Sequence, residues 1–151
     1  MKLCFLLSYT PNPRIKKRIA VCKKEYDISL IYWKRSEINI WGKIDKEIEL
    51  IEINVMSNNG DPLARIVPTI IFARQAIYNL KMRQPDCIYI ENLDMLLVAW
   101  LYCLGKKPKP KIIYEVADVH SLLIDPQDTI LRRLIQKFLK SVDALLCKSI
   151  D

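Results

Sequence analysis

Two side chains with acid–base chemistry, Asp118 and His120, follow an apolar stretch in the segment 111-KIIYEVADVHSLL-123. His120 is the only histidine of the chain. An imidazole changes its charge near neutral pH, so it can donate or accept a proton beside a carboxylate. Asp118 and His120 are therefore our candidate catalytic residues. The structural alternative is that Asp118 caps a turn and His120 is a packing residue at the end of a strand.

Further polar side chains follow two other apolar stretches. Tyr9, Asn12 and Arg14 lie in the turn after 2-KLCFLLS-8, and Glu91 and Asn92 follow 87-CIYI-90. Because ligands of open α/β sheets bind beyond the carboxyl ends of the strands, these five residues are candidates for substrate binding.

Apolar runs and helical patterns alternate along the whole chain. We expect strands at 2–8, 28–33, within 48–55, at 87–91, at 112–116 and at 144–148. Helices are expected to start after Asn12, Asp61 and Asp128 and to include 93–104. This order predicts an α/β fold, a doubly wound and mostly parallel Rossmann-like sheet, with residues 1–151 as one domain.

Helix ends and buried faces can also be predicted. Asn12 with Pro13 is typical of a helix start, Gly105 of a helix end, and a helix from Pro62 should end before Pro85. We expect the second helix to bury Leu63, Ile66, Val67, Ile70, Ile77 and Leu80. We expect the third helix to bury Leu93, Leu96, Leu97, Trp100, Leu101 and Leu104. The alternation of apolar and polar residues in the third strand changes phase between Leu50 and Ile51. This change predicts a bulge or a fully buried centre in that strand.

Composition limits the cellular setting and the partners. The net charge of +7 permits nucleic acid, an anionic membrane surface or phosphate-bearing molecules as partners, and selects none of them. The five cysteines form no CxxC pair and lie in apolar segments, so we expect reduced thiols, a cytoplasmic protein and no metal. No signal peptide or membrane-spanning segment is evident.

Common catalytic motifs are missing from the sequence. The turn after residue 8 contains no glycine, which excludes a GxGxxG dinucleotide site, and the chain has neither a P-loop nor a GxSxG elbow. The cluster 14-RIKKR-18 opposes the dipole of the helix that it opens. Either an anion compensates it or, the reading that we favour, it is a solvated basic face.

Four stretches carry a resemblance to a known family. They are 13-PRIKKRI-19, 85-PDCIYIENLDMLLVAWL-101, 112-IIYEVADVHSL-122 and 143-DALLCKSI-150. In their order and spacing they resemble the N-terminal half of a family-4 glycosyltransferase of the GT-B fold. The resemblance covers nearly the whole chain, although no single motif in it is specific.

The resemblance implies a retaining transfer of a sugar from a nucleotide-sugar to a polysaccharide or lipid-linked acceptor, in cell-envelope polysaccharide biosynthesis. This chain would be the acceptor-side domain and inactive alone, because the nucleotide-sugar domain would be missing. His120 would reach the donor sugar and its phosphates, and Asp118 would match the family's aspartate. Ser149 would match a serine of the last strand, which makes it a further candidate for substrate binding. No metal or other cofactor is implied. Many family members have glycines in the turn at 9–14, where this chain has prolines.

Two alternatives to an enzyme fragment stay open. The chain can be a single-domain subunit that docks on a separate catalytic partner, which predicts an exposed apolar patch along the C-terminal edge of the sheet. It can also be a basic α/β domain that binds nucleic acid, which predicts steeply salt-dependent affinity. We rank this last, because aromatic and basic residues do not alternate on one surface. The positive charge would also suit peripheral attachment at the inner membrane face.

Overall fold

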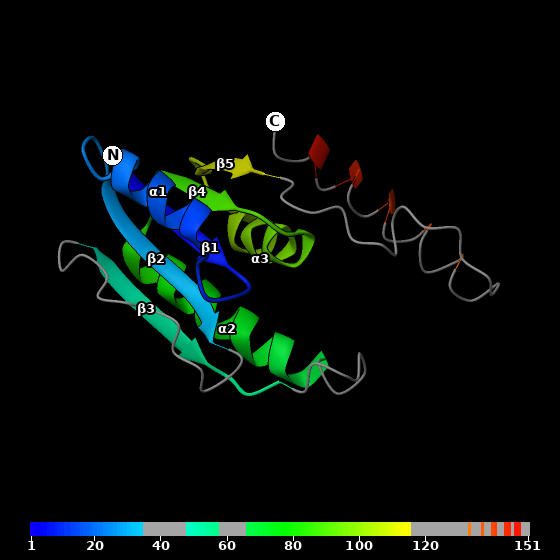
Figure 1. Ribbon diagram of the computed structural model, residues 1–151. Helices are drawn as coiled ribbons and strands as arrows, with labels where there is room; N and C mark the ends of the chain where they lie inside the picture. The colour runs from blue at the N-terminus through cyan, green and yellow to red at the C-terminus, as the bar shows by residue number, and fades with distance from the viewer. Residues whose placement is uncertain are drawn as a thin grey trace.

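The computed structural model describes residues 1–34, 48–57 and 66–115, together with isolated residues from 133 to 148 (Figure 1). Eight elements follow one another in this part of the chain. They are β1 (Lys2–Leu7), α1 (Pro13–Cys22), β2 (Asp27–Lys34), β3 (Glu49–Asn54), α2 (Ile66–Arg83), β4 (Cys87–Ile90), α3 (Leu93–Cys103) and β5 (Lys111–Tyr114).

The strands form one five-stranded sheet in the order β3-β2-β1-β4-β5, and every pairing is parallel. The apolar runs of β1 and β4 lie at its centre, and all four residues of β4 are buried. Parallel strands with helices on both faces have both sides covered, which is why these two strands are apolar apart from the exposed Lys2 at the start of β1. The predicted α/β, Rossmann-like fold is confirmed.

Alternate residues of each strand enter two separate apolar cores. The α1 core lies between the sheet and α1, and includes Phe5, Leu7, Ile15 and Ile19. The α2–α3 core lies between the opposite face of the sheet and the helices α2 and α3, and includes Trp33, Phe72, Met95 and Tyr102. Figure 1 shows α1 apart from α2 and α3, with the sheet between them.

Three predicted helix ends are confirmed. Asn12 is the N-cap of α1, where its side-chain Oδ1 accepts a hydrogen bond from the backbone N–H of Ile15 at 3.0 Å, and Pro13 follows it. The helix α2 ends at Arg83, two residues before Pro85. Gly105 follows the C-cap of α3 with φ of +74°, a left-handed conformation that glycine adopts without steric cost.

The third strand differs from its prediction. β3 pairs with β2 in continuous register from Ser29↔Glu49 to Lys34↔Asn54, without a bulge. Only Ile53 is fully buried in it, while Leu50 is exposed. The phase change in its sequence reflects its position at an edge of the sheet, where side chains on both faces reach solvent.

The predicted buried faces of the two long helices were partly wrong. The helix α2 buries Phe72, Ala76 and Leu80, whereas Ile66, Val67 and Ile70 are exposed. The helix α3 buries Met95, Leu96, Val98, Ala99, Tyr102 and Cys103 and leaves Leu97, Leu101 and Leu104 exposed. Apolar residues occur on several sides of both helices, so periodicity alone does not select the face that meets the sheet.

The described residues beyond β5 correct one further expectation. Residues 144, 145, 147 and 148 are helical, whereas we expected a strand at 144–148. The expectation failed because a short apolar run is compatible with both a strand and a buried helix. The five cysteines are free thiols, three of them buried. No helix within the described ranges combines the length and apolar character needed to span a bilayer.

Candidate functional site

The strand order creates a topological switch point at the carboxyl edge of the sheet. β1 lies between β2 and β4. The chain leaves β1 toward α1 on one face and leaves β4 toward α3 on the other face. The loops after β1 and β4 therefore diverge, and such a switch point is where ligands of doubly wound sheets bind.

A hydrogen bond joins the two diverging loops. The Nδ2 of Asn92, directly after β4, donates to the Oγ of Ser8, directly after β1, at 2.7 Å. Asn92 is the N-cap residue of α3, yet its side chain makes no capping hydrogen bond to that helix. Its amide group is turned instead toward the switch point, where it holds the Ser8 hydroxyl in place.

An ion pair joins α1 to the loop after β4. The Nη2 of Arg14 lies 3.1 Å from the Oε1 of Glu91. The Glu91 side chain is only 1% exposed, whereas that of Arg14 is 44% exposed. A buried carboxylate requires compensation of its charge, and Arg14 supplies it while one side of the guanidinium stays open to solvent.

A second carboxylate lies beside the first. The backbone N–H of Glu115 donates to the carbonyl oxygen of Ile90 at 2.9 Å, which continues the pairing of β4 with β5 by one residue. Glu91 and Glu115 therefore occupy equivalent positions on neighbouring strands. Two adjacent carboxylates repel each other unless cations lie close to them.

Arg18, one turn after Arg14, provides the second cation. Its Nη1 forms an ion pair with Glu115 and contacts the hydroxyl of Tyr89, which in turn donates to Glu115. The Arg18 guanidinium also lies 5.7 Å from the centroid of the Tyr89 ring. Arg14 approaches Glu115 as well, with Nη1 3.9 Å from Oε1. One face of α1 thus neutralises both carboxylates.

Burial raises the pKa of the Tyr89 hydroxyl, and the charges of Arg18 and Arg14 partly oppose this rise. The phenol therefore stays protonated at neutral pH and acts as a hydrogen-bond donor to Glu115. Its ring packs against Phe5 in the α1 core, with the ring centroids 4.9 Å apart. The cluster of Arg14, Arg18, Tyr89, Glu91 and Glu115, here called the charge cluster, rests on that core.

The structure brings some of the predicted site residues together. Arg14, Glu91 and Asn92 lie at the switch point, and Tyr9 is half-buried in the loop after β1. Asn12 is occupied in capping α1. Asp118, His120 and Ser149 lie outside the described residues.

Sequence reasoning missed three members of the charge cluster, Arg18, Tyr89 and Glu115. The interpretation of 14-RIKKR-18 as a solvated face holds for the exposed Lys16 and Lys17, but Arg14 and Arg18 face the carboxylates. Their spacing of one helical turn was a usable signal, since residues four apart share a helix face. The role of Glu115 depends on the strand register, which no local pattern contains.

The residues at the switch point can hydrogen-bond a ligand in several ways. Ser8 and Asn92 offer both donors and acceptors, Glu91 offers acceptors, and Arg14 offers donors. Among the described residues, no group of three or more histidine, cysteine, aspartate or glutamate side chains is arranged to hold a metal ion. No protein-family model matches this chain, and no curated protein sequence matches it significantly.

Proposed function

We propose that this chain is the acceptor-side domain of a retaining glycosyltransferase of the GT-B type. In this proposal the complete enzyme moves a sugar from a nucleotide-sugar to a polysaccharide or lipid-linked acceptor, in cell-envelope polysaccharide biosynthesis. The observation that carries the proposal is the group of polar side chains at the switch point, where Arg14 pairs with Glu91 and Asn92 pairs with Ser8.

The charge balance at the switch point favours a hydroxyl-rich ligand over a phosphate. Two carboxylates and two guanidinium groups lie together, so the charge cluster is nearly neutral. The buried Glu91 carboxylate holds the Arg14 guanidinium and offsets its charge, which weakens attraction for a phosphate, whereas the exposed part of that guanidinium and the Asn92 amide can hydrogen-bond neighbouring sugar hydroxyls. The loop after β1 also lacks the glycines that allow a backbone to approach a pyrophosphate closely.

This ligand preference suggests which domain binds which substrate. The acceptor binds at the switch point of this domain, and a second domain or a partner subunit holds the nucleotide-sugar. By the resemblance given above, His120 and Asp118 act at the donor sugar, where the leaving diphosphate needs stabilisation. The enzyme requires no metal in this scheme, and attachment to an anionic membrane surface would bring it to a lipid-linked acceptor.

The test uses the complete gene product that contains this chain. It is incubated with a panel of nucleotide-sugars and with short oligosaccharide and lipid-linked acceptors, and release of nucleoside diphosphate is measured. We expect release that depends on the acceptor. Glu91→Gln should raise the KM for the acceptor and leave the KM for the donor unchanged, because Gln keeps the size of the side chain but loses its charge.

The matched control is Lys17→Met, which removes a charge from an exposed position of α1 outside the charge cluster. This variant should behave as the wild type does. His120→Ala should lower kcat strongly without lowering the melting temperature. Acceptor-dependent release that is insensitive to Glu91→Gln would remove the switch point from the proposal, and no release with any donor would refute it entirely.

A further inference from the structure

The solvent side of α2 carries many apolar side chains, together with the exposed Arg74, Gln75 and Lys81. Val67, Tyr78 and Met82 are 64%, 63% and 66% exposed, and Ile70 and Ile71 are also exposed. A helix on the surface of a sheet normally turns charged and polar side chains outward. Contiguous exposed apolar side chains of this kind mark an interaction surface.

The exposed residues of α2 are spaced for packing against another helix. Val67, Ile71, Arg74 and Tyr78 follow one another at intervals of four, three and four residues, and Met82 follows one turn later. Alternating intervals of this kind place side chains in one seam, as in coiled coils. This set of five residues is here called the α2 seam.

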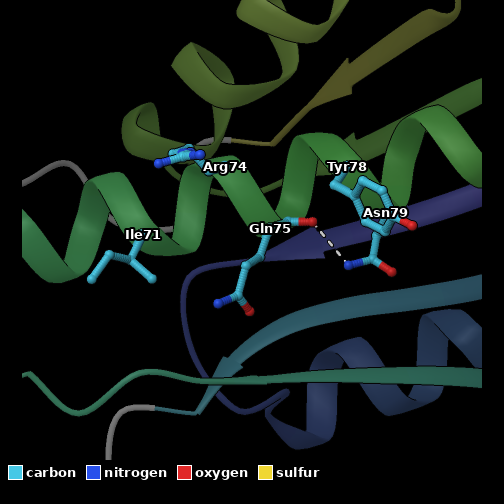
Figure 2. Close-up of a pocket in the computed structure, with 5 residues that line it drawn as sticks. All are labelled: Ile71, Arg74, Gln75, Tyr78 and Asn79. Atoms are coloured by element: carbon cyan, nitrogen blue, oxygen red, sulfur yellow. Dashed lines mark hydrogen bonds between the residues drawn. The ribbon is translucent and has the colours of Figure 1, made fainter.

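A shallow, open hollow lies over the middle of the α2 seam. It has a volume of about 510 Å³ and is lined by Ile71, Arg74, Gln75, Tyr78 and Asn79. Figure 2 shows these five side chains on α2, with Ile71, Gln75 and Asn79 directed to the side on which β3 runs. A hollow over an apolar seam can receive the side chains of a partner helix, which a flat surface cannot.

The charge at the centre of the seam limits the occupant. Arg74 lies midway along it, α2 contains no acidic residue, and none of the ion pairs within the described ranges involves Arg74. Two copies of α2 related by two-fold symmetry would bring Arg74 against Arg74, which disfavours a second copy of this chain. A bilayer would require the guanidinium to enter the apolar layer together with Ile71 and Tyr78, at a considerable desolvation cost.

We propose that the α2 seam binds an amphipathic helix of another protein or domain, which carries a carboxylate at the middle of its apolar stripe. That carboxylate pairs with Arg74 while apolar side chains cover Val67, Ile71, Tyr78 and Met82. The pair sets the register and the identity of the partner, and the apolar contacts supply most of the affinity. This inference is independent of the proposed glycosyl transfer, because the seam and the switch point use different residues.

The test uses three synthetic helical peptides with the same apolar heptad stripe. They differ only at the central position of the stripe, which is Glu, Leu or Lys. Each peptide carries a fluorophore, and its binding to the wild-type chain, Arg74→Glu and Lys17→Glu is measured by fluorescence anisotropy. Lys17→Glu is the matched charge reversal, on an exposed position of α1.

We expect the wild-type chain to bind the Glu peptide at least about tenfold more tightly than the Lys peptide, since a charge-assisted hydrogen bond is formed or lost. Arg74→Glu should reverse this preference, and Lys17→Glu should leave it unchanged. Circular dichroism of each variant confirms that it is folded.

Three results would overturn the proposal. In the first, none of the peptides binds the wild-type chain. In the second, the Glu and Lys peptides bind equally well. In the third, wild-type chain sediments with phosphatidylcholine vesicles containing about one third phosphatidylglycerol, Arg74→Glu does not, and no peptide preference is found. That last result would assign the seam to a lipid surface instead of a helix.

Discussion

The two faces of the sheet hold their helices in different ways. On one face α1 is attached by a modest apolar core and by the charge cluster at the carboxyl edge. On the other face α2 and α3 share a larger apolar core, in which the Trp33 and Phe72 rings stack with centroids 4.9 Å apart. The first attachment is directional and polar, and the second is broad and apolar.

The two kinds of attachment contribute differently: ion pairs position side chains, and apolar burial stabilises the fold. Ion pairs fix the place of a side chain because their geometry is specific, but their net contribution to folding is small once desolvation is counted. Apolar burial contributes more and specifies position less. The polar candidate site therefore lies where α1 is attached by charges, while the α2–α3 core provides most of the folding free energy.

The largest expected effect is in the α2–α3 core. Phe72→Ala removes a fully buried ring that stacks on Trp33 and leaves a cavity. We expect the free energy of unfolding to fall by about 3–5 kcal/mol, measured by urea denaturation. A loss below about 1 kcal/mol would mean that this face is not the stabilising one.

An intermediate effect is expected in the charge cluster. Arg14→Met leaves the buried carboxylate of Glu91 without its cation, and we expect a loss of about 2 kcal/mol, because Arg14 itself is partly exposed. Glu91→Leu in the same chain should restore part of that loss. A double-mutant cycle measures the coupling, and a coupling free energy near zero would contradict the role assigned to this pair.

A smaller, pH-dependent effect is expected at the β2–β3 edge. The hydrogen bond from the Tyr32 hydroxyl holds the pKa of Glu52 below its usual value of 4.5. Burial opposes this lowering, and the hydrogen bond and positive charge of Lys34 add to it. Because this pKa is lowered by folding, its stabilisation is present above pH 4.5 and is lost as the pH falls through the folded value. Glu52→Gln should reduce the acid dependence of the unfolding free energy by up to about 1 kcal/mol. Identical acid profiles for wild type and variant would exclude the contribution.

The smallest effect is expected on the solvent side of α2. Tyr78→Gln changes an exposed side chain that lies outside both cores, so the unfolding free energy should stay within about 0.5 kcal/mol of the wild type. Thermal and urea denaturation measure it. A large loss would show that Tyr78 belongs to the folded core, and would remove it from the α2 seam.

The fold was predictable because its central elements are locally unambiguous. The apolar runs of β1 and β4, the Asn12–Pro13 helix start and Gly105 each point to one local structure, and the structure confirms them. The buried faces of α2 and α3 were not predictable, because apolar residues surround both helices. Tertiary packing decides which side of each helix meets the sheet. In α2 the buried side is the one on which Phe72 stacks against Trp33 of β2.

The candidate site was predictable in part, for a related reason. The rule that ligands bind beyond the carboxyl ends of parallel strands pointed to Arg14, Glu91 and Asn92, and the structure places them at the switch point. The contribution of Glu115 could not be inferred, because it depends on the register between β4 and β5. Such a register is a property of the whole sheet and is not visible in either strand alone.

The two arginines of α1 also have a consequence for how the chain folds. β5 is an edge of the sheet that the described residues form, and edge strands are prone to pair out of step. A shift of β5 by one residue would turn the Glu115 side chain to the opposite face and leave Arg18 without its anion. The correct alignment is thus the one in which both Arg14 and Arg18 face a carboxylate, so one turn of α1 favours the native register of β5 over a shifted one.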